Sequence, residues 1–398
     1  MRICLVSQEY PPDAWGGIAT QTQLKARGLA ERGHEVHVLS ASDERGRHAY
    51  AADGATIHRV PEPELPTPGY EPSTYWLLYS AAVAAELQRL SEDIRFEIVH
   101  FPEYGAEGFV YQTDTFRYRT ARYVVQLHGP LEMFATHMGW PDRGTPLHEI
   151  GCFMERMVIR HADALLASSH TTADFCAERY GCSRDDIRVI HSAIDTARFA
   201  PGDPPADLRH PRLLFVGNLA RNKGVDRVSE VVLGLVSRYP DIHLRLIGRA
   251  DPAFEADLRA RIAAAGGDRH FELLGEVPNE ELPAHYRWSD FFVGPSEHEP
   301  GPGNVYLEAM ACSKPVIAGR TGGAPEAVVD GETGLLVDPL NLGELEQAII
   351  RLADDRALRA RLGRNGRRRV EDRFSVDRYI GEVERLYAEI AARTRDGA

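Results

Sequence analysis

Short apolar runs recur along the whole chain and alternate with longer stretches of helical periodicity. In the first half these runs are 3–6, 36–39, 98–101, 123–127, 164–167 and 189–190. Continuous apolar runs are typical of strands buried on both faces of a parallel sheet. Between the first two runs, Leu24, Gly28 and Leu29 share one helical face, and Gly33 stands where a C-terminal cap is expected. Strand, helix and strand in this order predict βαβ units and a doubly wound sheet.

The pattern stops at a proline-rich segment and then starts again. Residues 199–211, FAPGDPPADLRHP, contain four prolines and no apolar period, so they predict a linker. Apolar runs return at 213–216, 244–247, 271–274, 291–293, 316–318 and 335–337. We therefore predict two α/β domains, 1–198 and 212–375.

Composition and charge narrow the class of protein. The 398 residues include 46 Lys and Arg against 59 Asp and Glu, a net charge of −13, so no overall attraction to nucleic acid is expected. The arginine run 367–369 is interleaved with acidic residues and is interpreted as a solvated helical surface. Five widely spaced cysteines without a CxxC pair argue against a disulfide framework and a structural zinc site. The N-terminus lacks a signal-peptide pattern and no run approaches about 18 apolar residues, so we expect a cytoplasmic protein without membrane association.

Two loops after predicted strands have the composition of anion sites. Gly16 and Gly17 precede the first helix, where backbone N–H groups and the positive helix end can approach a phosphate. On its own this pair is explained better as a tight turn. Arg221 and Lys223 follow the strand at 213–216, at the sheet edge where open α/β sheets bind ligands. A surface lysine before a helix-start glycine explains this second loop equally well.

Residues 295–339 carry the strongest signal. A loop rich in Pro, Gly and acidic residues leads into the helical run NVYLEAMAC. The N–H groups of Gly303, Asn304 and Val305 would form a helix N-terminus able to receive a phosphate or a sugar hydroxyl. Glu308 lies one turn later, and because a carboxylate repels phosphate, its expected partner is a pair of ribose hydroxyls.

The ordered set of motifs resembles glycosyltransferase family 4, retaining enzymes of the GT-B fold that use nucleotide-sugar donors. The resemblance covers nearly the whole chain and rests on the GG after the first strand, His128-Gly129, Lys223-Gly224, and then SDFFVGPSEHE, LEAMACSKPV, GGAPE and GETGLLVDP. It implies two Rossmann-like, doubly wound domains facing across a cleft. Domain 1–198 would bind the acceptor and domain 212–375 the donor. The C-terminal helix 376–398 would cross back to complete the first domain.

The resemblance also implies roles for single residues. Lys223 should pair with the donor diphosphate and Glu308 with the ribose, while His128 should lie near the donor sugar and Glu299 should hold sugar hydroxyls. The expected catalytic residues are therefore His128, Lys223 and Glu299. The expected donor contacts are Gly16, Gly17, Arg221, Lys223, Gly303, Asn304, Val305 and Glu308.

Three features depart from the family pattern, and the least consequential is Ser313, where glycine is usual. Asn218 stands where the family usually has arginine, and Arg221 is the candidate to replace that charge. One residue more than usual separates Glu299 from Glu308. Either a bulged loop returns Glu299 to its place, or its role passes to a backbone group or to Glu297.

The first-domain loops provide the candidates for acceptor binding, namely Tyr10, Glu103 and His128. No D-x-D motif occurs in the sequence, and enzymes of this kind generally need no bound metal. We therefore expect no metal site for catalysis and no cofactor apart from the nucleotide-sugar co-substrate.

These observations together predict a hexosyltransferase-type glycosyltransferase. It would move a sugar from a nucleoside-diphosphate sugar, with a UDP-sugar favoured, to a hydroxyl of a small or glycan acceptor, with retention. Two alternatives stay open: a nucleotide-sugar epimerase on a similar scaffold, and a non-catalytic nucleotide-sugar-binding protein, which Asn218 and the lengthened loop would suit. A Rossmann dehydrogenase is excluded because no GxGxxG follows a strand.

Overall fold

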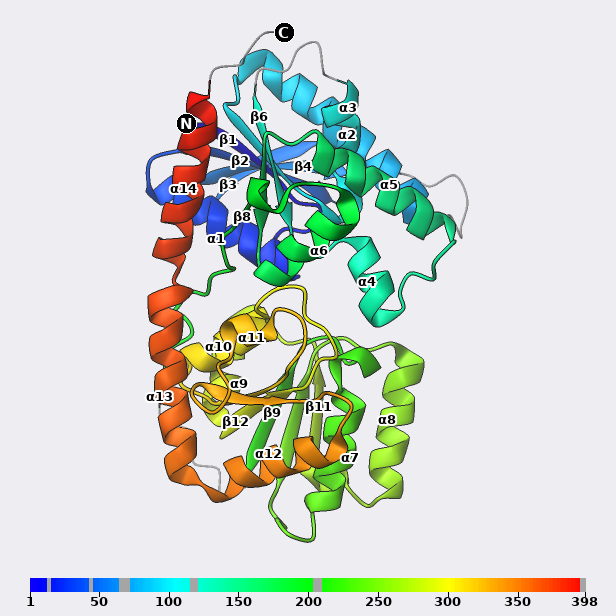
Figure 1. Cartoon of the computed structure of the whole chain (residues 1–398), viewed down its shortest axis with the longest axis vertical. Helices are drawn as coiled ribbons and strands as arrows, with labels where there is room; N and C mark the ends of the chain where they lie inside the picture. Colours follow the sequence, from blue (N-terminus) through cyan, green and yellow to red (C-terminus); the bar gives the residue numbers. More distant parts are fainter. Residues whose placement is uncertain (13–15, 43–45, 64–71, 115–120, 203–209, 394–398) are drawn as a thin grey trace. The chain divides into compact units, whose positions relative to one another are not determined.

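The computed structural model describes residues 1–12, 16–42, 46–63, 72–114, 121–202 and 210–393 (Figure 1). The chain forms two compact units, one of Met1–Ser192 with Val376–Ala398 (unit 1) and one of Ala193–Ser375 (unit 2). The segment 199–211 begins inside unit 2, where Phe199 is 3% exposed and contacts the Tyr286 ring. The middle of this segment, residues 203–209, lies outside the described residues.

Unit 1 is built on an eight-stranded sheet in the order β3-β4-β2-β1-β5-β6-β7-β8. Every neighbouring pair is parallel except β3 with β4. The apolar runs of the first half lie in these strands, except that Ile190 of the run 189–190 follows the end of β8. The β3–β4 hairpin was not predicted. Its first strand, HAYAA, carries little β-prone side-chain surface and is mostly exposed. The strands are β1 (Arg2–Val6), β2 (Glu35–Ser42), β3 (His48–Ala52), β4 (Ala55–Pro61), β5 (Ile98–Pro102), β6 (Arg122–Leu127), β7 (Ala164–Ala167) and β8 (Ile187–Val189).

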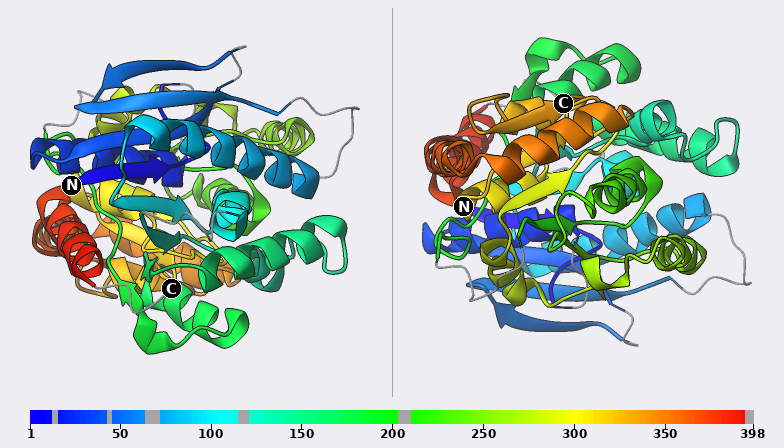
Figure 2. Two further views of the ribbon diagram at one scale, coloured as in Figure 1. Left: turned by 90° about the horizontal axis from the view of Figure 1, so that it is seen from above. Right: turned by 90° about the horizontal axis from the view of Figure 1, so that it is seen from below.

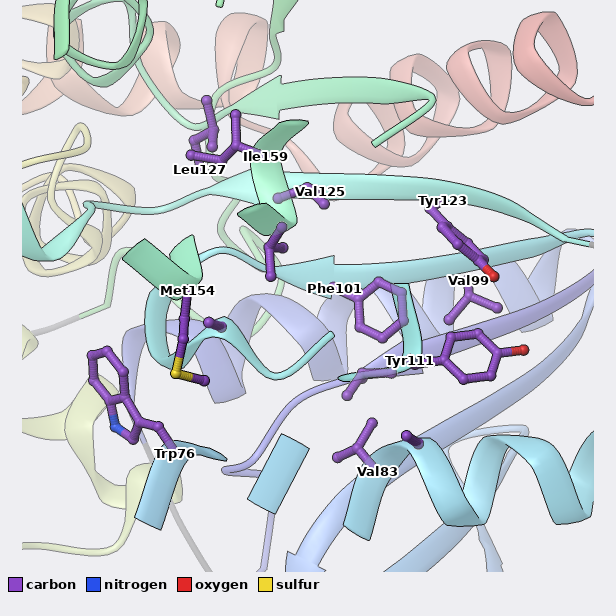
Figure 3. Packing of buried hydrophobic residues seen from close by; sticks show 14 of the residues in the cluster. Trp76, Val83, Val99, Phe101, Tyr111, Tyr123, Val125, Leu127, Met154 and Ile159 are labelled. Carbon is purple, nitrogen blue, oxygen red and sulfur yellow. The ribbon is translucent and has the colours of Figure 1, made fainter. Parts of the chain in front are cut away.

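Helices cover both faces of this sheet (Figures 1 and 2). On one face α1 packs against α14, and on the other α2, α3 and α5 pack together. The second face has an aromatic centre in which the rings of Phe101, Tyr111 and Tyr123 lie 5.7–6.3 Å apart (Figure 3). The helices of unit 1 are α1 (Gly17–Glu31), α2 (Pro72–Asp93), α3 (Phe109–Asp114), α4 (Leu131–Met138), α5 (Pro146–Arg160), α6 (His170–Tyr180) and α14 (Val376–Ala392).

The last helix, α14, belongs to unit 1, as the crossing-back prediction requires. Glu384 accepts hydrogen bonds from Arg32 and His34, each at 2.9 Å. The Tyr387 hydroxyl lies 2.6 Å from Nδ1 of the buried His100. Polar contacts therefore hold the middle of α14 against the segment that follows α1 and against β5.

Unit 2 has a six-stranded parallel sheet in the order β11-β10-β9-β12-β13-β14. Helices α7, α8 and α12 cover one face and α9, α10 and α11 the other (Figure 2). The strands are β9 (Arg212–Val216), β10 (His243–Ile247), β11 (Phe271–Gly275), β12 (Phe291–Gly294), β13 (Val316–Gly319) and β14 (Gly334–Val337). The helices are α7 (Val225–Leu235), α8 (Pro252–Ala264), α9 (Leu282–Trp288), α10 (Asn304–Ala311), α11 (Ala324–Ala327), α12 (Leu342–Asp354) and α13 (Arg356–Arg373). No described helix has an apolar stretch long enough to cross a bilayer.

The arginine run on α13 differs from the solvated surface that its composition suggests. Arg367 donates to the carbonyls of Thr196, Phe199 and Ala311, and Arg369 donates to two carbonyls of α11. The last carbonyls of a helix lack hydrogen-bond partners within the helix. These guanidinium groups donate to such carbonyls at the ends of α10 and α11.

The contact between α1 and α14 depends on Gly28. A Cβ at this position would come within 2.5 Å of Cγ1 of Ile380, a β-branched side chain with little freedom to move. Gly28→Ala should therefore lower the stability of unit 1 by about 1–3 kcal/mol through overpacking, despite the better helix propensity of alanine. Gly234→Ala in α7 is the matched control, because its Cβ would meet nothing within 4 Å. The free energy of unfolding of this control, measured with urea, should rise by up to about 1 kcal/mol. Equal effects of the two substitutions would contradict the packing argument.

Candidate active site

In unit 2, the loops after β9 and β12 meet where the strand order reverses. Ligands of open α/β sheets bind at this switch point, outside the carboxyl ends of the strands. Lys223 follows β9 and Glu299 follows β12, and Lys223 Nζ donates to Glu299 Oε1 at 2.6 Å. A backbone hydrogen bond of 2.8 Å from Glu297 to the Asn222 carbonyl ties the two loops together. The structure thus brings two of the predicted catalytic residues into direct contact, with side chains 24% and 16% exposed.

Two glycines after β13 hold the backbone of Glu299. Gly323 donates its N–H to the Glu299 carbonyl at 2.6 Å. A Cβ at Gly322 would lie 2.2 Å from that carbonyl oxygen, and its φ of +67° also favours glycine. Any larger residue there would displace the loop that carries Glu299.

The next helix, α10, begins beside this loop. Its N-cap is Gly303 at φ +79°, and a Cβ there would come within 2.5 Å of the Tyr306 ring. Asn304 and Val305 follow in the first turn, where N–H groups have no acceptor within the helix and the helix dipole is positive. The helix start expected from the sequence is therefore present, and it follows a glycine in a backbone conformation that other residues rarely adopt.

Glu308 lies one turn into α10 and is 8% exposed. The Tyr286 hydroxyl donates to its Oε2 at 2.6 Å, so one carboxylate oxygen has a fixed direction. Burial raises the pKa of Glu308 to about 7.

Of the two arginines near Lys223 in sequence, Arg227 contacts the loop after β12 and the expected donor contact Arg221 does not. Arg221 is 65% exposed and turns toward α7 and α8, where it contacts Asp226, Asp257 and the Phe254 ring. Arg227 instead reaches the loop after β12 and pairs with Glu297 at 2.9 Å. Lys223 lies before α7, and Gly224 between the two residues has a left-handed φ of +79°, so helical spacing gave no signal for this contact.

In unit 1, the loops after β1, β5 and β6 leave neighbouring strands at the same sheet edge. The loop after β1 leads to α1, which starts at Gly17 with Gly16 as its N-cap. A Cβ on Gly16 would come within 2.2 Å of Glu9 Oε2, so a carboxylate already lies against this helix start. Residues 13–15 of this loop lie outside the described residues.

Glu103, expected at the acceptor site, is fully buried instead. Its Oε1 accepts the N–H groups of His128 and Gly129, each at 2.6 Å. Burial raises the pKa of Glu103 to about 7, although these N–H groups act to lower it. The carboxylate therefore faces the backbone beneath His128 rather than a surface ligand.

A second buried carboxylate, Glu155 of α5, holds the continuation of the same segment. It accepts the N–H of Leu131 at 3.0 Å and the hydroxyl of Tyr180 at 2.7 Å. Pro130 has no N–H to satisfy. Two carboxylates thus bind the backbone from His128 to the first residue of α4, and the sequence analysis missed the second.

His128 itself is partly exposed, and a buried ammonium group lies behind it. Lys25 of α1 is 2% exposed and lies 2.6 Å from Gln126 Oε1 and 3.0 Å from His100 Nε2. Burial lowers the pKa of Lys25 to about 7. Burial and this ammonium group lower the pKa of His128 to about 3, so its imidazole is neutral near pH 7. A lysine directly after Leu24 on the predicted apolar helix face was the available sequence signal.

Tyr10, the remaining acceptor candidate, is 1% exposed. Its carbonyl accepts from Arg59, whose guanidinium lies 5.9 Å from the Tyr10 ring centroid. The side chain is therefore part of the interior of unit 1 and does not offer its hydroxyl at the surface.

Comparison with known proteins agrees with these features. Residues 15–198 match the family described as Glycosyltransferase Family 4, and residues 199–369 match Glycosyl transferases group 1. The chain is 31% identical over 388 residues to the GDP-mannose-dependent alpha-(1-6)-phosphatidylinositol monomannoside mannosyltransferase of Mycolicibacterium smegmatis. That alignment covers 91% of this chain and 92% of the mannosyltransferase.

Solved structures show the same fold. Sucrose-phosphate synthase from Thermosynechococcus elongatus superimposes with a TM-score of 0.83 at 22% identity, over 99% of this chain and all of that one. HepE from Anabaena, solved with UDP and glucose, gives a TM-score of 0.76 at 19% identity, over 98% of this chain and 100% of HepE. The prediction of the GT-B fold is confirmed, and the chain belongs to glycosyltransferase family 4 and is a glycosyltransferase.

Proposed function

We propose that this enzyme transfers a sugar from a nucleoside-diphosphate sugar to a hydroxyl of a small or glycan acceptor, with retention and without a bound metal. The observation that carries the proposal is the Lys223–Glu299 pair at the switch point of unit 2, next to the start of α10. An ammonium group and a positive helix end suit a diphosphate, and a neighbouring carboxylate suits sugar hydroxyls.

The donor would bind to unit 2 through three groups. Lys223 exchanges its bond with Glu299 for a phosphate oxygen, and Glu299 is then available to the hydroxyls of the sugar. The N–H groups of Asn304 and Val305 receive the other end of the diphosphate. Glu308, fixed by Tyr286, accepts from the ribose.

Catalysis would come from stabilising the charge of the departing diphosphate. As the sugar–phosphate bond breaks, negative charge grows on the leaving oxygen, and the Lys223 ammonium group lowers its energy. The leaving phosphate oxygen takes the proton of the acceptor hydroxyl on the same face, so the configuration is retained without a covalent enzyme intermediate. His128, neutral near pH 7, exchanges hydrogen bonds with a hydroxyl of the donor sugar rather than adding charge.

We propose a UDP-sugar as the donor. The alternative donor is GDP-mannose, on which the Mycolicibacterium smegmatis relative depends. Membership of a glycosyltransferase family favours transfer over the epimerase and non-catalytic alternatives. Release of nucleoside diphosphate that depends on an added acceptor tests transfer directly. The assay should compare UDP-glucose with GDP-mannose, and soluble glycans with a phosphatidylinositol mannoside.

Lys223 and Glu308 should affect different kinetic constants. Lys223→Ala should lower kcat by roughly 10²-fold, because its charge interacts more strongly with the transition state. Glu308→Gln keeps the volume and should mainly raise the donor KM, since ribose contacts change little during the reaction. Arg238→Ala, a surface arginine paired with Asp354, is the control and should leave both constants unchanged. A Lys223→Ala enzyme with normal kcat would refute the proposed role.

The enzyme should need neither magnesium nor manganese. Lys223, the α10 N-terminus and Arg227 supply the positive potential that a metal ion provides in D-x-D enzymes. Initial rates should therefore be the same after exhaustive treatment with EDTA. If activity disappeared and returned only with Mg²⁺ or Mn²⁺, the metal-free mechanism would be wrong.

We further propose that Glu103 positions His128 rather than contacting the acceptor. Its Oε1 accepts the N–H groups of both His128 and Gly129, and the side chain has no surface exposure. Because the carboxylate is buried, its protonation should also contribute to the pH dependence of stability.

The substitution Glu103→Gln should isolate the contribution of this carboxyl group to the pH dependence of stability. The folded protein binds a proton on Glu103 more tightly than the unfolded chain, so this carboxyl stabilises the fold below about pH 4.5 and loses that contribution as pH rises to about 7. Glutamine does not titrate. Relative to the variant, wild type should lose up to roughly 3 kcal/mol of unfolding free energy across this range. Urea unfolding at pH 5 and pH 8 measures the difference, and parallel pH curves would contradict it.

A further inference from the structure

Three side chains with metal-binding atoms meet in unit 1, outside the proposed donor site. Glu132 lies in the first turn of α4, while His148 and Cys152 lie on α5. One carboxylate oxygen, one imidazole nitrogen and the thiol sulfur all lie within 4.8 Å of one another. His148 and Cys152 are four residues apart, so they share one helix face. Small shifts of these side chains, with Glu132 and His148 moving slightly apart, would let a single ion contact all three.

The chemistry of this set points to one class of metal. Zinc accepts thiolate, imidazole and carboxylate ligands together, and sites with three protein ligands keep a fourth position for water. Magnesium and calcium favour all-oxygen sites, so a buried thiol and an imidazole exclude them as the natural occupant.

The surrounding side chains are arranged as the outer contacts of a metal site. Arg143 donates to Glu132 Oε1 at 2.7 Å, which leaves Oε2 directed at His148 Nε2, also at 2.7 Å. The other ring nitrogen of His148, Nδ1, lies 3.3 Å from a Glu149 carboxylate oxygen. A carboxylate on the far nitrogen of a ligand histidine, and a hydrogen bond to the far oxygen of a ligand carboxylate, orient both ligands toward the metal.

The burial of the three ligands decreases from the thiol to the carboxylate. Cys152 is 8% exposed, and the side chains of His148 and Glu132 are 12% and 19% exposed. The thiol is thus protected on the inner side, while the carboxylate side stays open to solvent for an entering ion.

We propose that Glu132, His148 and Cys152 bind one Zn²⁺ ion, with water as the fourth ligand. Binding replaces the hydrogen bond between Glu132 and His148 by two metal bonds, and the Cys152 thiol releases its proton to solvent as it becomes a thiolate ligand. The ion joins the first turn of α4 to α5, and α4 begins two residues after Gly129. Cysteine spacing gives no signal for such a site, because its ligands come from two helices and three residue types.

Cobalt provides the test, because a cobalt–thiolate bond has a charge-transfer band in the near ultraviolet. Titration of the metal-free full-length protein with Co²⁺ should develop this band to one equivalent per chain, and Zn²⁺ should abolish it. Cys152→Ser and His148→Gln should each eliminate the band. Cys182→Ser, a partly exposed cysteine outside the cluster, is the control and should retain it.

Thermal unfolding gives a second measurement that does not depend on spectroscopy or on enzyme activity. Zn²⁺ should raise the melting temperature of wild type and Cys182→Ser in a concentration-dependent way and leave Cys152→Ser unchanged. Circular dichroism of each variant without metal identifies any that fails to fold. Wild-type protein without a thiolate band, or a band that persists in both cluster variants, would overturn the proposal.

Discussion

The parallel order of the two sheets is the constraint on which both groups of candidate residues depend. Parallel strands end at the same edge, so residues that follow neighbouring strands are close in space even when they are far apart in sequence. In unit 2 this places Lys223 beside Glu299, 76 residues later. In unit 1 it places Glu103 under the backbone of His128.

Several of the residues at these edges are ionisable and buried, which is costly unless they are hydrogen-bonded. Each of them has at least one hydrogen-bond partner. Glu103 and Glu155 bind backbone N–H groups, and Glu308 binds a tyrosine hydroxyl. Lys25 contacts an amide oxygen and a histidine instead of a carboxylate, so its positive potential is not cancelled locally. That uncompensated ammonium group is one reason why His128 resists protonation. The charged groups that set the electrostatic potential of the candidate site therefore include groups in the interior, beneath the residues that would touch a substrate.

The sequence predicted those parts of the fold and site that follow from local pattern. Continuous apolar runs predict buried parallel strands, and the motif 295–339 predicts a glycine-shaped loop before a helix. Side-chain direction was not predictable in the same way. Arg221 and Arg227 are both arginines near Lys223, but only the turn of α7 decides which one reaches the loop after β12. Tyr10 follows a strand as a ligand-binding residue would, yet Arg59, from a strand the sequence analysis did not identify, packs on its ring. The arginines of α13 look solvated in sequence because carbonyl partners on other helices leave no pattern of their own.

Helix α5 packs into the core with one face and holds the neighbouring segment in position with the adjacent face. Leu147, Gly151, Met154 and Val158 repeat at helical spacing and are buried. Gly151 brings α4 close, because a Cβ there would lie 2.7 Å from Leu131.

Beside this apolar stripe, α5 carries a second, polar stripe formed by His148, Cys152 and Glu155, again at spacings of four and three. A polar stripe on a helix interface is unfavourable unless each group has a partner. Glu155 has the Leu131 N–H and the Tyr180 hydroxyl, and His148 has Glu132. All of these partners except Tyr180 lie in the first turn of α4, directly after the segment that Glu103 holds. The polar stripe of α5 thus fixes the segment that carries His128 from the far side, and an ion between Glu132, His148 and Cys152 would strengthen the same contact.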